Sequence, residues 1–377
     1  MTHEGHNGGL REVLWVFLRL GVVAFGGPAA HTAMMREELV RRRGWVSDAR
    51  FVDLMGATNL IPGPNSTELA IHLGHERARW RGLMVAGVCF ILPAALIVTA
   101  LAWGYVEYGE TPPLQRVLYG AVPAVVAIVV WALAGLLGTV VKTVWLGLLV
   151  LVALAAYLAG VNELVVLFGG AALAAVVRAV RTTWTGPPRH RLVVPLLPLF
   201  HDPTAGELGR LFWTMLKIGA VLYGSGYVLL AFLERDFVDR LGWITQEQLL
   251  DAVSIGQVTP GPVFTTATFI GYLVAGPVGA FLATVAIFAP SFLLVGLLTR
   301  VTDRLRASPW SSALLDGVNA SAYALMAGVS WQLGGRAVVD WWTAAIALVT
   351  LVLLWRTRLN SAWYVLGGAC LGLLVAR

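Results

Sequence analysis

Apolar residues fill long continuous runs along the whole chain, and short polar loops separate the runs. Each run approaches the roughly 20 residues that an α-helix needs to cross a bilayer, and the continuous rather than alternating pattern favours helices. The runs cover residues 13–30, 52–73, 83–103, 118–140, 144–159 and 164–180, and then 211–230, 249–273, 278–298, 314–333, 341–355 and 362–376. The predicted fold class is an all-α polytopic membrane protein.

Composition supports this class. Of the 377 residues, 58% are hydrophobic and 13% are charged, about half the charged share of a soluble domain. The net charge of +6 comes from Lys and Arg in short loops, as in cytoplasmic loops of membrane proteins, so it does not indicate a nucleic-acid partner. Cys89 and Cys370 sit inside apolar runs and suggest neither a disulfide framework nor a metal site. We expect the lipid bilayer as the environment and no cofactor.

The sequence contains an internal repeat. The motif Pro62-Gly63-Pro64 recurs 198 residues later as Pro260-Gly261-Pro262. Other residues match at the same offset of 198: Arg19 with Lys217, Gly21 with Gly219, and Gly44-Trp45 with Gly242-Trp243. Further along the chain the offset is 197, and Pro93 matches Pro290 and Gly120 matches Gly317. Two halves that each carry a broken helix are typical of secondary transporters. We predict transmembrane repeats at 1–181 and 211–377, joined by a proline-rich cytoplasmic linker at 182–210.

Loop charges predict the topology. Arginines flank the first Pro-Gly-Pro segment on both sides, so this segment is expected to enter and leave the membrane on the cytoplasmic side. Each half then has about five crossings plus one re-entrant helical hairpin. Equivalent loops in the second half carry the opposite charge bias, which favours inverted over parallel repeats and puts both termini outside.

The Pro-Gly-Pro segments are expected to break helices. Proline lacks a backbone N–H and suits the first turn of a helix, so helices should end near Leu60 and Val258 and restart at Pro64 and Pro262. The free N–H groups of each new helix would form an anion site inside the membrane. Small polar residues follow each break, namely Asn65, Ser66, Thr67, Thr265 and Thr266. The alternative is that they only cap a kinked helix or pack between helices.

Three kinds of charged or titratable residue lie inside apolar runs. Arg19 and Lys217 occupy equivalent positions, so we predict that they supply positive charge to an anionic substrate; a snorkelling side chain or an ion pair is the alternative. Glu68 is the one acid in the first broken segment and is a candidate proton carrier. His72, one turn later, is placed to share its proton. A static partner of Arg19 is the other interpretation of Glu68.

Several motifs together resemble the chromate transporter family. They are the run from Phe25-Gly26-Gly27-Pro28 to His31, the Gly44-Trp45 turn, Pro62-Gly63-Pro64, the run from Ser66 to Gly74, and the second copy at 223–227 and 260–262. The resemblance implies a bacterial inner-membrane protein that exports chromate, driven by the membrane potential or proton gradient, with sulfate as a chemical look-alike. Tyr223 and Ser225 depart from the family's usual Phe and Gly.

These observations predict an oxyanion transporter that works by alternating access, with chromate held between the two breaks. The predicted substrate-binding residues are Arg19, Lys217, Pro62, Gly63, Pro64, Asn65, Ser66, Thr67, Pro260, Gly261, Pro262, Thr265 and Thr266. A sulfate carrier and a passive anion channel remain alternatives. A membrane enzyme is disfavoured because the sequence has no Cys/His metal cluster and no nucleotide-binding loop. A homodimer is left open.

Overall fold

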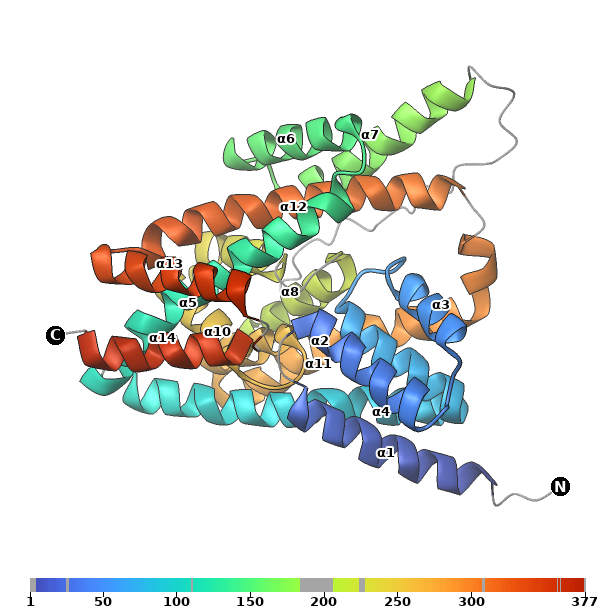
Figure 1. Cartoon of the computed structure of the whole chain (residues 1–377), viewed down its shortest axis with the longest axis horizontal. Helices are drawn as coiled ribbons and strands as arrows, with labels where there is room; N and C mark the ends of the chain where they lie inside the picture. The colour runs from blue at the N-terminus through green and yellow to red at the C-terminus, as the bar shows by residue number, and fades with distance from the viewer. Residues whose placement is uncertain are drawn as a thin grey trace.

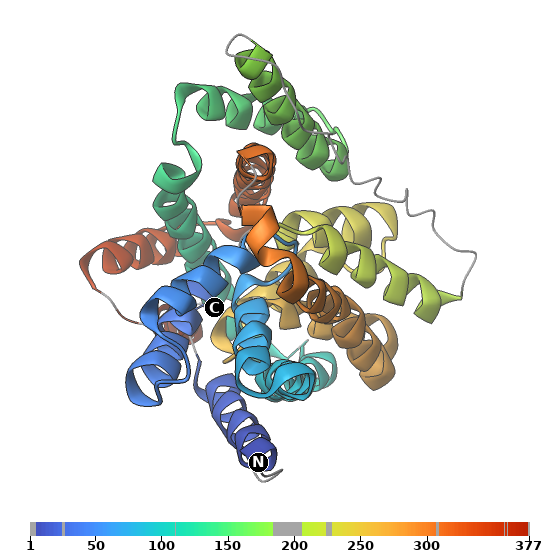
Figure 2. The same ribbon diagram turned by 90° about the vertical axis from the view of Figure 1, so that its right-hand side faces the viewer.

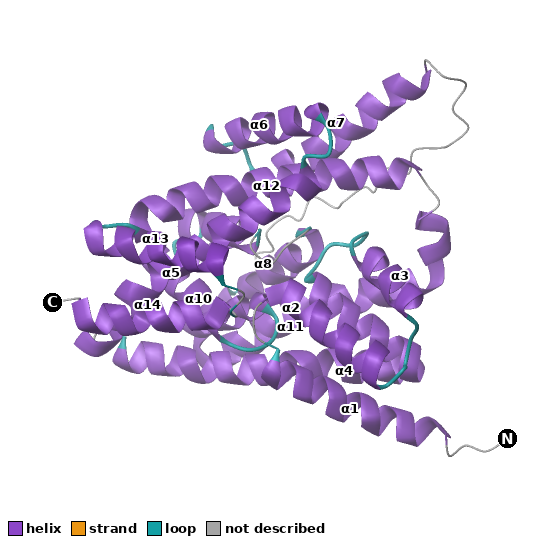
Figure 3. Ribbon diagram, in the orientation of Figure 1, coloured by secondary structure: helices purple, strands orange, loops and turns teal. Residues whose placement is uncertain are grey.

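The computed structural model describes residues 5–24, 27–109, 111–183, 206–223, 228–306, 309–357, 359 and 361–375. Within these residues every regular element is a helix, as Figure 3 shows, so the predicted all-α class is confirmed for them. Most of the predicted linker lies outside the described residues, as do Phe25, Gly26 and the motif at 224–227 with Ser225.

The first half contains α1 (Gly5–Val23), α2 (Gly27–Met35), the π-helix η1 (Arg36–Arg42), α3 (Asp48–Thr58), α4 (Asn65–Tyr108), α5 (Pro112–Val140), α6 (Val144–Leu158) and α7 (Glu163–Thr183). The second half contains α8 (Glu207–Val221), α9 (Leu229–Leu233), η2 (Glu234–Arg240), α10 (Gln246–Val258), η3 (Val263–Thr265), α11 (Thr266–Arg306), α12 (Pro309–Ala337), α13 (Trp341–Arg356) and α14 (Ser361–Val375). Equivalent elements therefore occur in the same order in the two halves (Figure 1).

Four described helices are long and apolar enough to cross a membrane. They span Asn65–Tyr108, Pro112–Val140, Glu163–Val180 and Val263–Thr299. α6, α13 and α14 are apolar but shorter. The chain is thus a helical membrane protein, as its hydropathy predicts.

α4 and α11 each contain one sharp turn at an equivalent place. Ala78 and Arg79 have φ/ψ of −141°/29° and 51°/−142°, and Ala275 and Gly276 have −144°/31° and 59°/−150°. A Cβ atom on Gly74 would overlap the carbonyl oxygen of Gly82, and a Cβ atom on Gly82 would overlap the carbonyl oxygen of Gly74. The two parts of α4 therefore run back along each other, as do the two parts of α11 around Gly271 and Gly279.

The turn of α4 predicts a stabilising substitution. Arg79 is the one described residue other than glycine with a positive φ, and its ψ of −142° belongs to a region that only glycine adopts without strain. Arg79→Gly should raise stability by about 1 kcal/mol, whereas Gly276→Ala at the equivalent position should lower it by about 1–2 kcal/mol. Thermal unfolding in detergent would measure both. Two shifts of the same sign would contradict this explanation of the turn.

The first apolar run does not cross the molecule. Glu12, near the start of α1, pairs with Arg43 after η1 (3.0 Å) and with Arg77 at the end of the first part of α4 (2.7 Å). α1 therefore enters from the arginine-rich end, stops at Val23, and α2 with η1 returns to that end. Figure 1 shows the two chain ends at opposite ends of the molecule. The expected crossing by residues 13–30, with both termini on one side, is wrong because apolar length alone does not reveal this return.

The two halves exchange packing partners. α5 packs against α13 and α14, while the equivalent α12 packs against α6 and α7, which lie in green along one edge of Figures 1 and 2. Glycines allow these contacts, because Gly120 lies against Gly368 and Gly317 lies against Gly170. Helices of each half therefore pack between helices of the other half, and the centre of the molecule lies between the two halves.

α5 and α12 run antiparallel. Lys142, just after α5, pairs with Asp316 near the start of α12 at 2.8 Å. At the other end, the hydroxyl of Tyr119 near the start of α5 donates to Asp340 beyond the end of α12. These two helices occupy equivalent positions in the predicted repeat, and in this pair they point in opposite directions.

Candidate functional site

Both Pro-Gly-Pro segments interrupt helices close to the predicted places. α3 ends at Thr58, and α4 begins at Asn65 after Pro64 as its N-cap. α10 ends at Val258, and η3 begins after Pro262. The missing N–H and fixed φ of proline account for both the stops and the restarts.

Reciprocal hydrogen bonds join the breaks of the two halves. The N–H of Gly63 donates to the carbonyl oxygen of Leu222 at 2.7 Å, and the N–H of Gly261 donates to that of Ala24 at 2.8 Å. Ala24 and Leu222 are equivalent residues just beyond the ends of α1 and α8. The two glycines have φ of 140° and 89°, which side chains disfavour. Each Pro-Gly-Pro break therefore meets the end of the first helix of the other half.

Glu68 lies at this meeting point. Its side chain is fully buried, and a Cβ atom on Gly63 would overlap its Oε1 atom. Oε1 also accepts a hydrogen bond from the hydroxyl of Ser291 in α11 at 3.5 Å. Among the described residues Oε2 has no hydrogen-bond partner. The acid of the first half thus contacts the second half directly.

Other buried polar atoms near the breaks also lack partners within the described part of the chain. They are the Oγ1 atom of Thr67, the Nδ1 atom of His72 and the Nε2 atom of Gln257. Gln257 lies in the last turn of α10, at the position equivalent to Asn59. Burying a polar group without a hydrogen bond costs about 1–3 kcal/mol, so these atoms favour a polar ligand or water beside each of them. The sequence singled out Thr67 and His72 but not Gln257.

His31 links two of the breaks. Its Nε2 atom lies 3.0 Å from the carbonyl oxygen of Ala24, and its Nδ1 atom lies 3.2 Å from the hydroxyl of Ser66. Since a carbonyl only accepts, Nε2 carries the hydrogen, and Nδ1 of the neutral ring accepts from Ser66. His31 therefore orients Ser66 at the start of α4. In the sequence it appeared only as part of a motif, because its two partners are revealed by the fold.

The polar residues after the second break are occupied locally. The hydroxyl of Thr265 donates to the carbonyl of Pro262 at 2.8 Å, and that of Thr266 donates to Val263 at 2.9 Å. In these bonds both hydroxyl hydrogens are used within the second break. At the first break, the amide of Asn65 donates to the side chain of Asn59 at 2.8 Å.

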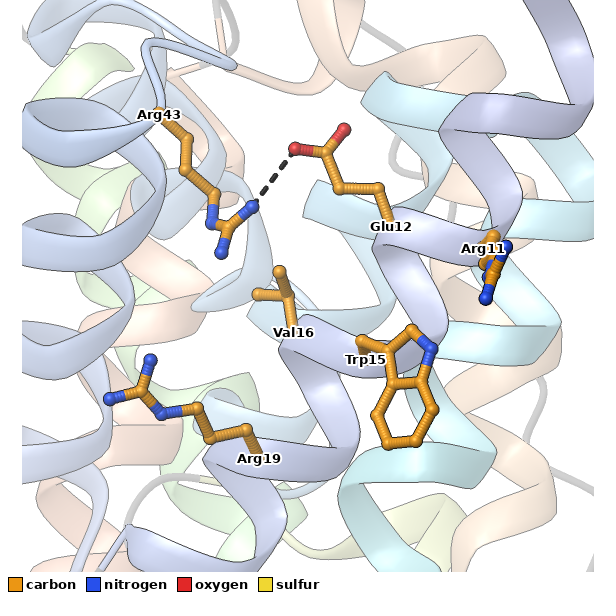
Figure 4. A pocket seen from close by; sticks show the side chains of 6 residues that line it. All are labelled: Arg11, Glu12, Trp15, Val16, Arg19 and Arg43. Atoms are coloured by element: carbon orange, nitrogen blue, oxygen red, sulfur yellow. Dashed lines mark hydrogen bonds and ion pairs between the residues drawn. The ribbon is translucent and has the colours of Figure 1, made fainter.

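The two equivalent cations have different surroundings. Lys217 forms a 2.6 Å ion pair with Asp236, which also pairs with Arg240 at 3.0 Å. Arg19 is exposed, has no ion pair among the described residues, and points into a cavity beside α1, as Figure 4 shows. Lys217 is therefore neutralised within the protein, whereas Arg19 is not.

This difference predicts unequal effects on stability. Lys217→Met leaves the carboxylate of Asp236, which is 3% exposed, with Arg240 alone, and should cost about 3 kcal/mol. Arg19→Met at the equivalent position breaks no ion pair and should change stability by less than about 0.5 kcal/mol. Thermal unfolding of the two variants in the same detergent makes the comparison. A change in Lys217→Met as small as that expected for Arg19→Met would show that the Lys217–Asp236 pair does not stabilise the fold.

Within the described residues, no group of three or more His, Cys, Asp or Glu side chains is arranged to hold a metal ion. The polar groups at the breaks are hydroxyls, amides, the imidazoles of His31 and His72, and the carboxyl of Glu68. The hydroxyls and amides among them can donate hydrogen bonds to an oxyanion.

Comparison with known proteins identifies the family. The family model described as "Chromate transporter" matches residues 11–176 and again residues 209–373. The chain belongs to the chromate transporter family. It is 36% identical to the chromate transport protein of Cupriavidus metallidurans, covering 97% of this chain and 93% of that protein. It is 34% identical to the probable chromate transport protein of Synechococcus elongatus, covering 92% of this chain and 90% of that protein.

A third relative, the chromate transport protein of Pseudomonas aeruginosa, is 29% identical over 95% of this chain and 91% of that protein. No solved structure matches. The family and the apolar helices together make this chain a membrane transport protein. All the helix breaks described above fall within the two matched stretches. The region between α7 and α8 lies outside both.

Proposed function

We propose that this protein exports chromate across the bacterial inner membrane as a secondary transporter coupled to the proton gradient or membrane potential. The relatives from Cupriavidus metallidurans and Pseudomonas aeruginosa are chromate transport proteins, and the similarity covers almost the whole chain. Chromate is a tetrahedral dianion, so the site must offer hydrogen-bond donors in place of water. Sulfate has the same shape and charge and is the competing cargo.

The reciprocal bonds Gly63–Leu222 and Gly261–Ala24 carry this proposal, because each holds a Pro-Gly-Pro segment against the other half. His31 connects the two places, since it contacts both Ala24 and Ser66 at the start of α4. The first N–H groups of α4, at Asn65 and Ser66, have no acceptor within the helix and face the break. The hydroxyl of Thr67 and the amide of Gln257 add donors that are unpartnered among the described residues. We place chromate here, between Pro62–Pro64 and Pro260–Pro262, without Lys217.

We further propose that the halves are inverted repeats, 1–181 and 211–377, that move against each other. The antiparallel course of α5 and α12 supports inversion, and the separate matches to the family model support the division. Each half then contributes two hairpins that reach the centre, the first broken at Ala24 or Leu222 and the second at Pro-Gly-Pro. Motion of one half changes both reciprocal bonds together, which is a physical basis for alternating access.

A line of titratable side chains supports coupling to protons. Glu68, His72 and Glu76 are spaced by four residues on α4 and share one face of the helix. Glu68 lies at the breaks, His72 is buried, and Glu76 pairs with the exposed Arg50 at 2.8 Å. We propose that protons pass between Glu68 and the arginine-rich end along this face. Glu76 was not recognised from the sequence because its pairing with Arg50 is a property of the fold.

Chromate uptake into inverted membrane vesicles, with and without an imposed proton gradient and with sulfate as competitor, tests the function. We expect concentrative chromate uptake that collapses when the gradient is dissipated. Saturable uptake that prefers sulfate would identify the protein as a sulfate carrier. Non-saturating flux down the chromate gradient would identify it as a channel. Vesicles without the protein are the control.

A further inference from the structure

The cavity beside α1 lies away from the helix breaks and has its own chemistry. It measures about 670 Å³ and is lined by Arg11, Glu12, Trp15, Val16, Arg19 and Arg43. Figure 4 shows Arg19 and Arg43 reaching into it from opposite sides, with Glu12 bonded to Arg43. Arg11 and Arg19 have no carboxylate partner among the described residues. The cavity therefore carries uncompensated positive charge.

The second repeat shows how such a cation is otherwise neutralised. There Lys217, the equivalent of Arg19, is paired with Asp236. In the first repeat the equivalent of Asp236 is Glu38, which pairs instead with Arg42 and with Arg43 at 2.8 Å. Arg19 is thus left for an anion that does not belong to the protein. This asymmetry between otherwise similar repeats indicates a binding site in the first repeat alone.

The surroundings of the cavity are apolar and face outward. Trp15 is 60% exposed, and Val22 and Val23 further along α1 are 48% and 42% exposed. Such side chains on a membrane protein lie against lipid, and exposed tryptophan is typical of the headgroup boundary. From Arg11 to Arg19 the helix rises about 12 Å, which covers the headgroup layer and the first part of the acyl chains.

We propose that this cavity binds an anionic phospholipid, with its phosphate between Arg19 and Arg43 and an acyl chain along Trp15 and Val22. Guanidinium groups bind phosphate oxygens through paired hydrogen bonds, which suits a phosphodiester at this position. Basic cavities on the cytoplasmic side of membrane helices bind anionic headgroups in the same way. The exposed apolar side chains favour a lipid over a free anion, because a free anion gains nothing from them.

The test measures binding of dioleoyl phosphatidylglycerol to the purified full-length protein by native mass spectrometry, with dioleoyl phosphatidylcholine as reference lipid. Arg19→Gln should weaken phosphatidylglycerol binding about tenfold or more, while binding of the reference lipid stays unchanged. Arg81→Gln is the matched control, since Arg81 is an exposed arginine at the same end that does not line the cavity. Arg19→Lys should retain part of the affinity because it keeps the charge.

Two results would overturn the proposal. Equal loss of binding in Arg19→Gln and Arg81→Gln would show attraction by general surface charge. If inorganic sulfate displaced phosphatidylglycerol and bound with similar affinity, and Arg19→Gln lost this sulfate binding, the cavity would be a site for free oxyanions. The melting temperature of each variant in phosphatidylcholine confirms that it is folded. The outcome does not depend on chromate transport, so the two proposals fail separately.

Discussion

Glu68→Gln is expected to abolish gradient-driven chromate uptake while leaving the protein folded. Glutamine has nearly the same shape and keeps an oxygen to accept from Ser291, but it cannot carry a proton. If Glu68 is the coupling residue, the initial rate of gradient-driven uptake should fall at least about tenfold, equivalent to about 1.4 kcal/mol on the barrier. Exchange of chromate across vesicles without a gradient should remain, because binding does not need the proton.

Glu107→Gln is the matched control for this experiment. Glu107 is an exposed acid at the far end of the same helix, so its loss removes one carboxylate without touching the breaks. Uptake by Glu107→Gln should match the parent protein. Unchanged gradient-driven uptake by Glu68→Gln would remove Glu68 from the coupling mechanism, and equal loss of uptake and exchange would instead assign it to binding.

Gly63→Ala and Gly261→Ala should each disrupt the packing of the helix breaks. A Cβ atom on Gly63 would overlap the carboxyl of Glu68 and lie 2.8 Å from the hydroxyl of Ser291. On Gly261 it would lie 2.7 Å from the Cβ atom of Ala94, the residue equivalent to Ser291. Overpacking and the positive φ together should cost about 2–4 kcal/mol in each variant.

Thermal unfolding and chromate transport should therefore both be impaired in these two variants. The strain also displaces the N–H groups that reach Leu222 and Ala24, so the link between the halves weakens. Gly135→Ala is the control, because a Cβ atom there meets open space inside helical α5 and should be neutral or slightly stabilising. Parent-like stability in Gly63→Ala would contradict the tight packing of the breaks.

Much of the fold follows from local sequence. Continuous apolar runs predict helices, and proline predicts where α3 and α10 end and where α4 begins. α10 begins with a capping box, in which Thr245 accepts from the N–H of Gln248 and Gln248 accepts from the N–H of Thr245; their three-residue spacing is typical of this motif. These features depend on residues close in the chain, which sequence patterns report directly.

The return of the chain after α1 does not follow from such patterns. The run 13–30 has the length and hydropathy of a crossing, but the ion pairs of Glu12 with Arg43 and Arg77 bring its start to the arginine-rich end. A helix that stops at the centre exposes carbonyls, and that of Ala24 is accommodated by Gly261 and His31. Gly261 lies more than 200 residues from Ala24 in the sequence, so this contact leaves no local signal.

The candidate site was predicted in part for the same reason. Glu68, Thr67 and His72 stand out as polar residues in an apolar run, and the structure brings Glu68 to the breaks. Ser291 and Gln257 look unremarkable in sequence and acquire their roles from packing between the halves. Lys217 stood out as an intramembrane cation, yet its charge is matched by Asp236.

Locating bound chromate tests the central claim most directly, and the anomalous scattering of chromium in crystals of the chromate-bound protein would locate it. We predict one chromium position between the two Pro-Gly-Pro segments, within hydrogen-bond reach of the first N–H groups of α4 and the side chain of Thr67. A chromium position in the cavity lined by Arg19 and Arg43, with none at the breaks, would contradict the proposed transport site.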